Sequence, residues 1–209
     1  MCRTYWYPLY VFVRRRGYDA HAAQDLTQGF LLRLIANESL RNVCPEKGRF
    51  RTFLLASMKN FLSTDWRDSQ RKKRGGGVEI LAWDAFDPEE RYRHEPRDAR
   101  DPDAEFDRRW AQALVTTALE QLKSEMVRNG DERRFDGLKR FLQGGDAATS
   151  YADAARELGM EEGGVRTAIF RMRRRYGEII REEIAGTVEK PEDVEDEIRY
   201  LVAILAEQG

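Results

Sequence analysis

The sequence has few of the residues on which metal sites and hydrolytic sites are usually built. Its 209 residues include only two cysteines, Cys2 and Cys44, and only two histidines, His21 and His94. So few cysteines cannot form a disulfide framework, and no Cys or His pair has the spacing of zinc ligands. A Ser-His-Asp arrangement for hydrolysis has equally little to draw on. We therefore expect no metal, no cofactor and no small-molecule substrate, and we expect that the chain is not an enzyme.

Long hydrophobic runs are also missing. No stretch reaches the roughly 18 apolar residues that a membrane-spanning helix requires. In the N-terminal segment MCRTYWYPLYVFVRRRG the arginines follow the apolar stretch, which is the reverse of a secretory signal peptide. These absences predict a protein without a membrane partner. Together with the scarcity of cysteine, they predict a location in the reducing cytoplasm.

Charged residues, by contrast, are abundant and unevenly distributed. They make up 35% of the chain, against roughly 25% in an average globular protein, which favours small helical domains with a large surface. Residues 1–80 contain 15 basic and 7 acidic side chains, whereas the remainder contains 21 basic and 30 acidic ones. A basic segment within a nearly neutral chain is typical of a part that binds a polyanion.

The first part of the chain begins with the pattern of two helices. An aromatic-rich helix is predicted to end at Gly17, and Asp19 is placed to cap a second helix that continues to about residue 37. Asp25 and Gln28 lie together on the flank of this second helix. Its apolar stripe has the i, i+4, i+8 spacing of a helix face and consists of Leu26, Phe30 and Leu34.

A third helix is predicted from about residue 50 to the basic run 71–74. The phenylalanines on one of its faces have core spacing, so we interpret them as core residues rather than as platforms for nucleic-acid bases. Trp66, beside Arg67, is the better candidate for stacking on a base. The glycines at 75–77 follow, and we interpret them as a hinge because no GxxxxGK[ST] phosphate loop surrounds them.

The composition changes again between residues 78 and 107. Three of the six prolines lie here, and nine acidic side chains oppose six basic ones between residues 87 and 109. Apolar side chains are sparse, so this segment cannot bury much surface. We interpret it as a flexible linker between two helical domains.

The segment SYADAARELGMEEGGVRTAIFRMRRRY, residues 150–176, has the pattern of a helix-turn-helix. Two short helices are joined by a turn with Gly159 at its centre. Five arginines and no acid lie between residues 166 and 175. This charge favours a recognition helix in the major groove of DNA over an ordinary helix pair with a solvated arginine face, which stays open as the alternative. The face opposite the apolar stripe contains Arg166, Thr167, Phe170, Arg171, Arg173 and Arg174.

The C-terminal segment is acidic and amphipathic. Eight acids and one base lie between residues 182 and 197. The stripe formed by Val194, Ile198, Leu201 and Leu205 requires an apolar partner. If that partner is the helix-turn-helix domain, the acids compete with DNA for the arginines. Alternatively, the stripe only completes a core.

Three of these segments together resemble the sigma-70 family of bacterial transcription factors, in its small extracytoplasmic-function class. QDLTQGFLLRL (24–34) is similar to the D-L-x-Q helix of conserved region two, and RTFLLASMKNFLSTDWRDSQRKKR (51–74) is similar to the helix after it. The segment 150–176 is similar to the helix-turn-helix of region four. The resemblance implies an all-α fold of two small helical domains joined by a flexible linker. Its parts are a region-two-like domain at 1–77, the linker at 78–107, a region-four-like domain at 108–186 and an extension at 187–209.

The resemblance also implies a function. A sigma factor binds core RNA polymerase and directs promoter recognition, DNA melting and transcription initiation, and an anti-sigma factor is a further partner that the family allows. Asp25 and Gln28 would bind the polymerase. The single-stranded −10 element would contact Lys59, Asn60, Trp66, Arg67, Arg71, Lys72, Lys73 and Arg74. The duplex −35 element would contact Arg166, Thr167, Phe170, Arg171, Arg173 and Arg174.

Two other classes of protein fit parts of the pattern. A stand-alone helix-turn-helix regulator would bind duplex DNA without polymerase and would not need the first domain. An RNA-binding or scaffold protein would use the basic helical domain and would not need a reader of duplex DNA.

Overall fold

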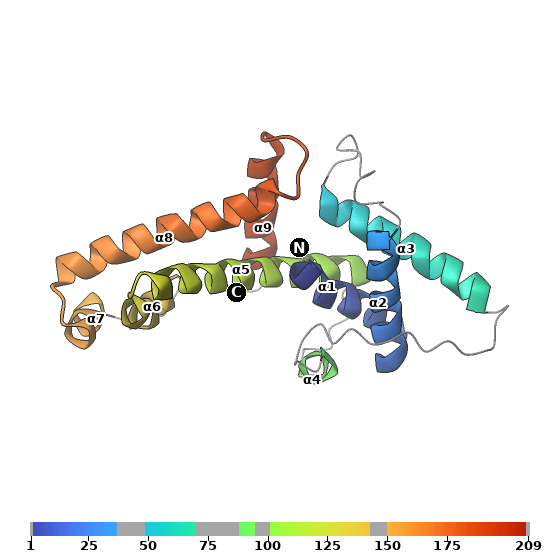
Figure 1. Cartoon of the computed structure of the whole chain (residues 1–209), viewed down its shortest axis with the longest axis horizontal. Coiled ribbons are helices and arrows are strands. Elements are labelled where there is room, and N and C mark those ends of the chain that lie inside the picture. Colours follow the sequence, from blue (N-terminus) through green and yellow to red (C-terminus); the bar gives the residue numbers. More distant parts are fainter. Residues whose placement is uncertain (1, 37–48, 70–87, 95–100, 143–149, 208–209) are drawn as a thin grey trace. The chain divides into compact units, whose positions relative to one another are not determined.

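In a computed structural model of the chain, all regular secondary structure in the described residues is helical (Figure 1). The structure describes residues 2–36, 49–69, 88–94, 101–142 and 150–207. The all-α fold expected from the sequence is therefore confirmed. The chain divides into two compact units, one formed by Met1–Ala113 with Thr187–Gly209 and the other by Leu114–Gly186.

The first unit begins with α1 (Cys2–Arg15) and α2 (Ala20–Ala36). The turn after α1 contains Gly17 at φ 93°, a conformation that glycine adopts without steric cost. The carboxylate of Asp19 accepts a hydrogen bond of 2.9 Å from the backbone N–H of Ala22, so it caps α2 as predicted. Five consecutive residues of α1 have no exposed surface, and they are Leu9, Tyr10, Val11, Phe12 and Val13. A helix that is buried on all sides lies at the centre of its unit.

The third helix, α3 (Phe50–Ser69), buries an aliphatic stripe, while its phenylalanines at 50, 53 and 61 are half-buried. Leu54, Met58 and Leu62 are buried at i, i+4, i+8 spacing. The ring of Phe61 lies 5.6 Å from the ring of Phe30 in α2. The aromatic side chains near the centre of α3 are therefore engaged in packing within the unit.

The interpretation of residues 78–107 as a flexible linker is corrected at two places. α4 (Pro88–Arg93) contacts α1, and α5 (Pro102–Arg128) begins inside the segment. Glu89 accepts hydrogen bonds from the hydroxyl of Tyr10 at 2.5 Å and from Arg14 at 2.9 and 3.0 Å. Charged and aromatic contacts hold α4, so the scarcity of apolar side chains did not reveal it. Residues 78–87 and 95–100 lie outside the described residues.

The C-terminal helix α9 (Asp193–Ala206) belongs to the first unit. Its Glu197 is 1% exposed and pairs with Arg51 of α3 at 2.6 Å and with Arg49 at 2.9 Å. Val194 and Leu201, which lie before and after Glu197 on α9, are also buried. The apolar stripe of α9 thus completes a core, but it is the core of the first unit. Residues 187–209 therefore cluster with the first unit, and not with the helix-turn-helix domain that the alternative offered as the partner of the stripe.

Arg51 is the centre of a buried polar cluster in this unit. Besides Glu197 it pairs with Asp107 of α5 at 2.7 Å, and Asp107 accepts a hydrogen bond of 2.6 Å from the hydroxyl of Tyr200. The guanidinium also lies 4.0 Å from the ring centroid of Tyr200 and 5.1 Å from that of Trp110. The cluster therefore connects α3, α5 and α9, three helices far apart in the sequence.

The second unit contains the C-terminal part of α5, followed by α6 (Glu132–Leu138), a 3₁₀ turn η2 (Lys139–Phe141), α7 (Tyr151–Leu158) and α8 (Glu162–Ala185). Gly130, at φ 79°, turns the chain between α5 and α6. A Cβ on Gly137 would lie 3.0 Å from Leu158, so the lack of a side chain lets α6 approach α7. The buried core consists of Ala118, Leu122, Phe135, Leu138, Phe141, Ala154, Ala155, Val165, Ile169, Met172 and Ile179.

Candidate DNA-binding surface

The turn between α7 and α8 is the one that the sequence predicts. Gly159 adopts the left-handed conformation, φ 65° and ψ 36°, immediately after α7. The backbone N–H of Met160 donates to the carbonyl of Ala155 at 2.9 Å, and that of Gly159 donates to Arg156 at 3.4 Å. These bonds satisfy the last carbonyls of α7 in a Schellman motif, which glycine adopts most readily. α8 begins three residues later, so the two helices form a helix-turn-helix.

The packing of α8 determines which of its faces is exposed. Val165, Ile169 and Met172 are buried in the core of the unit, as the sequence predicts. Tyr176 lies on the same side of α8, one turn further along, and its hydroxyl donates a hydrogen bond of 2.9 Å to the carbonyl of Val115. The opposite side of α8 is therefore directed away from the core.

We call the exposed side of α8 the cationic face, defined as Arg166, Thr167, Phe170, Arg171 and Arg174. All five side chains are exposed, and their spacing places them on one side of a helix over two turns. Phe170 is 67% exposed, the highest value among the large hydrophobic side chains of the described residues. The ring of Phe170 therefore lies exposed among the cations of this face.

Several members of the cationic face already have partners within the helix. Arg166 donates to Glu162 at 2.6 Å, and the hydroxyl of Thr167 donates to the carbonyl of Gly163 at 3.0 Å. Arg174 pairs with Glu178 at 3.4 Å. All three contacts lie at the surface, where such pairs are weak enough to exchange for contacts with a ligand.

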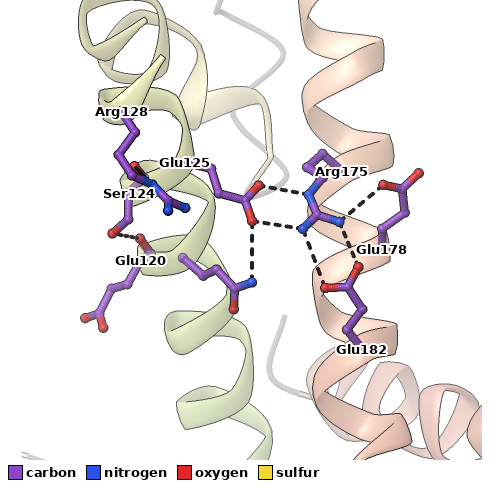
Figure 2. A network of polar contacts seen from close by, with 8 residues as sticks. Glu120, Ser124, Glu125, Arg128, Arg175, Glu178 and Glu182 are labelled. Atoms are coloured by element: carbon purple, nitrogen blue, oxygen red, sulfur yellow. Dashed lines mark hydrogen bonds and ion pairs between the residues drawn. The ribbon is translucent and has the colours of Figure 1, made fainter. Parts of the chain in front are cut away.

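Arg173 and Arg175 are engaged differently. Arg173 donates from Nε and Nη2 to the carbonyl of Phe141, at 3.2 and 2.8 Å, so it caps η2. Arg175 makes two hydrogen bonds of 2.8 Å to Glu125 of α5 and one of 2.8 Å to Glu182, as Figure 2 shows. These bonds raise the pKa of Arg175 and lower that of Glu125. The arginine count in the sequence therefore overstates the positive charge that this face offers to an anionic ligand.

The residues predicted to bind polymerase lie together on α2. Asp25 is exposed and Gln28 is half-exposed one turn later, away from the buried side of α2 that contains Thr27 and Phe30. The carboxylate of Asp25 pairs with the imidazole of His21 at 3.1 Å. The two residues thus occupy one accessible side of the helix.

The residues predicted to bind the −10 element are only partly described. Lys59 pairs with Asp103 of α5, and Asn60 is exposed on the next position of α3. The backbone of Trp66 and Arg67 is helical, but their side chains lie outside the described structure, as do all of Arg71, Lys72, Lys73 and Arg74. The ion pair of Lys59 could not be found from the sequence, because its partner is 44 residues away.

Within the ranges that the structure describes, no three His, Cys, Asp or Glu side chains are grouped so that they could hold a metal ion. None of the helices in these ranges has the length and apolar character needed to cross a membrane. Comparisons of the chain with protein-family models, with curated proteins and with solved structures found no match. A function must therefore be argued from the residues and geometry described above.

Proposed function

We propose that this chain is a sigma factor, which binds core RNA polymerase and directs it to promoter DNA. The observation that carries the proposal is the helix-turn-helix of α7 and α8, with its glycine turn and its exposed cationic face. An α-helix fits the major groove of B-DNA, and arginine is the side chain that most often reads guanine there. The similarity of residues 24–34 and 51–74 to region two of the family supports the step from DNA binding to polymerase binding.

The cationic face supports two kinds of contact with duplex DNA. Arg166 and Arg171 extend from the exposed side of α8, so they reach base edges when α8 lies in the major groove. Arg174 lies farther along the helix and neutralises phosphates, which positions the protein without reading sequence. Phe170 supplies an apolar surface for a thymine methyl group. In this proposal α8 reads the −35 element.

The first unit supplies the remaining contacts. Asp25 and Gln28 form the accessible side of α2 on which polymerase would dock. Asn60, Trp66 and the basic residues after them would hold one strand of the −10 element once it is unpaired. Unstacking a base costs a few kcal/mol, which aromatic stacking and phosphate contacts offset. The chain would carry out no chemistry itself, because the polymerase forms the phosphodiester bonds.

A stand-alone helix-turn-helix regulator is the second candidate function. The ion pair between Lys59 and Asp103 fits this candidate, because a stand-alone regulator does not need Lys59 for single-stranded DNA. Such a regulator would use the same face of α8 on duplex DNA. It would need neither polymerase nor melted DNA.

The decisive experiment is co-purification with core RNA polymerase, followed by run-off transcription on genomic fragments. A sigma factor binds the core enzyme and gives discrete transcripts, whereas a stand-alone regulator binds duplex fragments alone. Asp25→Lys should weaken binding to the core enzyme in a competition assay against the native chain. Glu120→Lys, the same charge change at an exposed position of the second unit, is the matched control. Equal binding by both variants and the native chain would remove α2 from the proposal.

A further inference from the structure

Arg166 is held from two sides, unlike the other arginines of the cationic face. Its Nη2 atom donates to Oε1 of Glu162 at 2.6 Å. Its Cζ atom lies 5.1 Å from the ring centroid of Tyr151, the first residue of α7. Tyr151 in turn stacks on Phe141, with centroids 5.3 Å apart and an interplanar angle of 11°. Because Phe141 is only 8% exposed, a chain of contacts connects the core of the unit to this guanidinium.

Stability does not account for the pair between Glu162 and Arg166. Both side chains are exposed, 47% for Glu162 and 63% for Arg166, and an exposed i,i+4 pair contributes only a few tenths of a kcal/mol. Glu162 also puts a negative charge at the edge of a face that would approach phosphates. A carboxylate in the first turn of α8 favours the helix dipole but weakens binding to any DNA, and orienting Arg166 is a way for it to add selectivity.

The geometry leaves Arg166 able to contact a base while it stays paired. A guanidinium carries five N–H donors in a planar fork, and two of them lie on Nη2. One donor of Nη2 serves Glu162, which leaves the other and those of the neighbouring nitrogens for the O6 and N7 acceptors of a guanine. An arginine that is already oriented loses less side-chain entropy when it binds.

We propose that Glu162 and Tyr151 are positioning residues that hold Arg166 for a guanine in the major groove. The inference rests on the proposed function, since it requires that α8 enters the groove of duplex DNA. It adds a requirement for guanine at the base pair facing the first turns of α8. It also assigns a role to an acid that a purely cationic surface would not contain.

The test measures guanine discrimination by the full-length chain. Binding sites are first selected from a random duplex library. The guanine whose replacement weakens binding most is then exchanged for 7-deazaguanine, which lacks the N7 acceptor, and for the other bases. We expect the native chain to bind about 5- to 150-fold more weakly when that guanine is replaced by another base. Arg166→Ala and Glu162→Ala should lose most of this preference, whereas Tyr151→Phe, which keeps the ring, should retain it.

Glu161→Ala is the matched control. Glu161 is the neighbouring acid, it is exposed, and it makes no side-chain capping bond to α8. Both acid-to-alanine variants should bind non-specific duplex more tightly than the native chain, because each removes one negative charge. Only Glu162→Ala should lose guanine discrimination. Equal discrimination by Glu161→Ala and Glu162→Ala would overturn the inference and leave DNA binding intact. A chain that selects no duplex sequence at all would overturn the proposed function as well.

Discussion

At the residue scale, Arg51 and Glu197 form a buried ion pair in the first unit. Burial alone would lower the pKa of Arg51, but the hydrogen bond that Arg51 donates to Glu197 and the charge of Asp107 raise it above its ordinary value. The guanidinium is therefore charged whenever the protein is folded. A buried charge that loses its partner keeps its desolvation penalty without compensation.

Replacing Glu197 should consequently be costly. We expect Glu197→Ala to lower the free energy of unfolding by about 3 kcal/mol, the lower end of the range for a broken buried pair, because Asp107 still faces Arg51. Urea-induced unfolding followed by circular dichroism measures this change. Glu192→Ala removes an exposed acid one residue before α9 and should change the unfolding free energy by less than about 0.5 kcal/mol. Similar losses for the two variants would show that the pair is not the stabilising contact.

The tyrosine in the same cluster gives a prediction for alkaline pH. Burial and the hydrogen bond to Asp107 raise the pKa of Tyr200 from 10.0 to about 12. Between these values the unfolded chain has lost a proton that the folded chain keeps, so stability is present below pH 10 and falls as the pH rises toward 12. Tyr200→Phe should be less stable at neutral pH, because it loses a hydrogen bond, but its stability should fall less steeply in this window.

The measurement for Tyr200 is the free energy of unfolding in urea at several pH values across that window. Tyr18→Phe, which removes a hydroxyl outside the cluster, is the control. An unchanged slope for Tyr200→Phe would assign the alkaline loss of stability to other groups.

At the scale of elements, two glycines of the helix-turn-helix should respond in opposite directions to the same substitution. Gly177 lies in the middle of α8, and a Cβ there would meet nothing within 4 Å. Gly177→Ala should raise stability by about 0.5–1 kcal/mol, because alanine has the higher helix propensity. Gly159→Ala should lower it by about 1 kcal/mol or more, because φ is +65° at this turn. Thermal unfolding of the two variants tests the pair, and a gain for both would mean that the turn does not need glycine.

The cationic face and the Arg175 network make different predictions for neighbouring residues. Arg174→Ala should weaken binding to all duplex sequences alike and reduce the slope of log affinity against log salt concentration by about one. Arg175→Ala should instead lower the stability of the second unit, because it leaves Glu125 and Glu182 without their shared cation. Fluorescence anisotropy over a salt series separates the two. If Arg175→Ala changes the salt slope as much as Arg174→Ala, Arg175 contacts DNA in the complex.

At the scale of the whole molecule, the chain returns to its first unit after building the second. Deleting residues 187–209 removes α9, including Glu197 and the apolar stripe, from the first unit. We expect the truncated chain to lose helicity in the first unit, while any binding of duplex DNA by the helix-turn-helix, as proposed above, stays unchanged. Limited proteolysis and duplex binding at low salt measure the two effects. Tighter DNA binding with no loss of helicity in the first unit would show instead that the acids mask the arginines of the helix-turn-helix.

The sequence by itself determined the helices of the first unit up to α3 and the helix-turn-helix, with their buried faces, but not α4 or the start of α5. The turns at Gly17, Gly130 and Gly159 and the cap at Asp19 follow from local chemistry, because each uses bonds within a few residues. The buried stripe of α8 follows from helical periodicity. The same periodicity therefore predicts the exposed face opposite this stripe, which contains Arg166, Thr167, Phe170, Arg171 and Arg174.

Only the tertiary structure decided which charges meet. Arg51 and Glu197 are 146 residues apart, Arg14 and Glu89 are 75 apart, and Arg175 and Glu125 are 50 apart. With 36 basic and 37 acidic side chains in the chain, no local pattern selects these pairs. Packing brings these residues together. Because Arg51 and Glu197 are buried, the loss of either one would leave the other charge without a partner that compensates its desolvation. For the same reason α9 belongs to the first unit, and Arg175 supports α8 rather than adding to its cationic face.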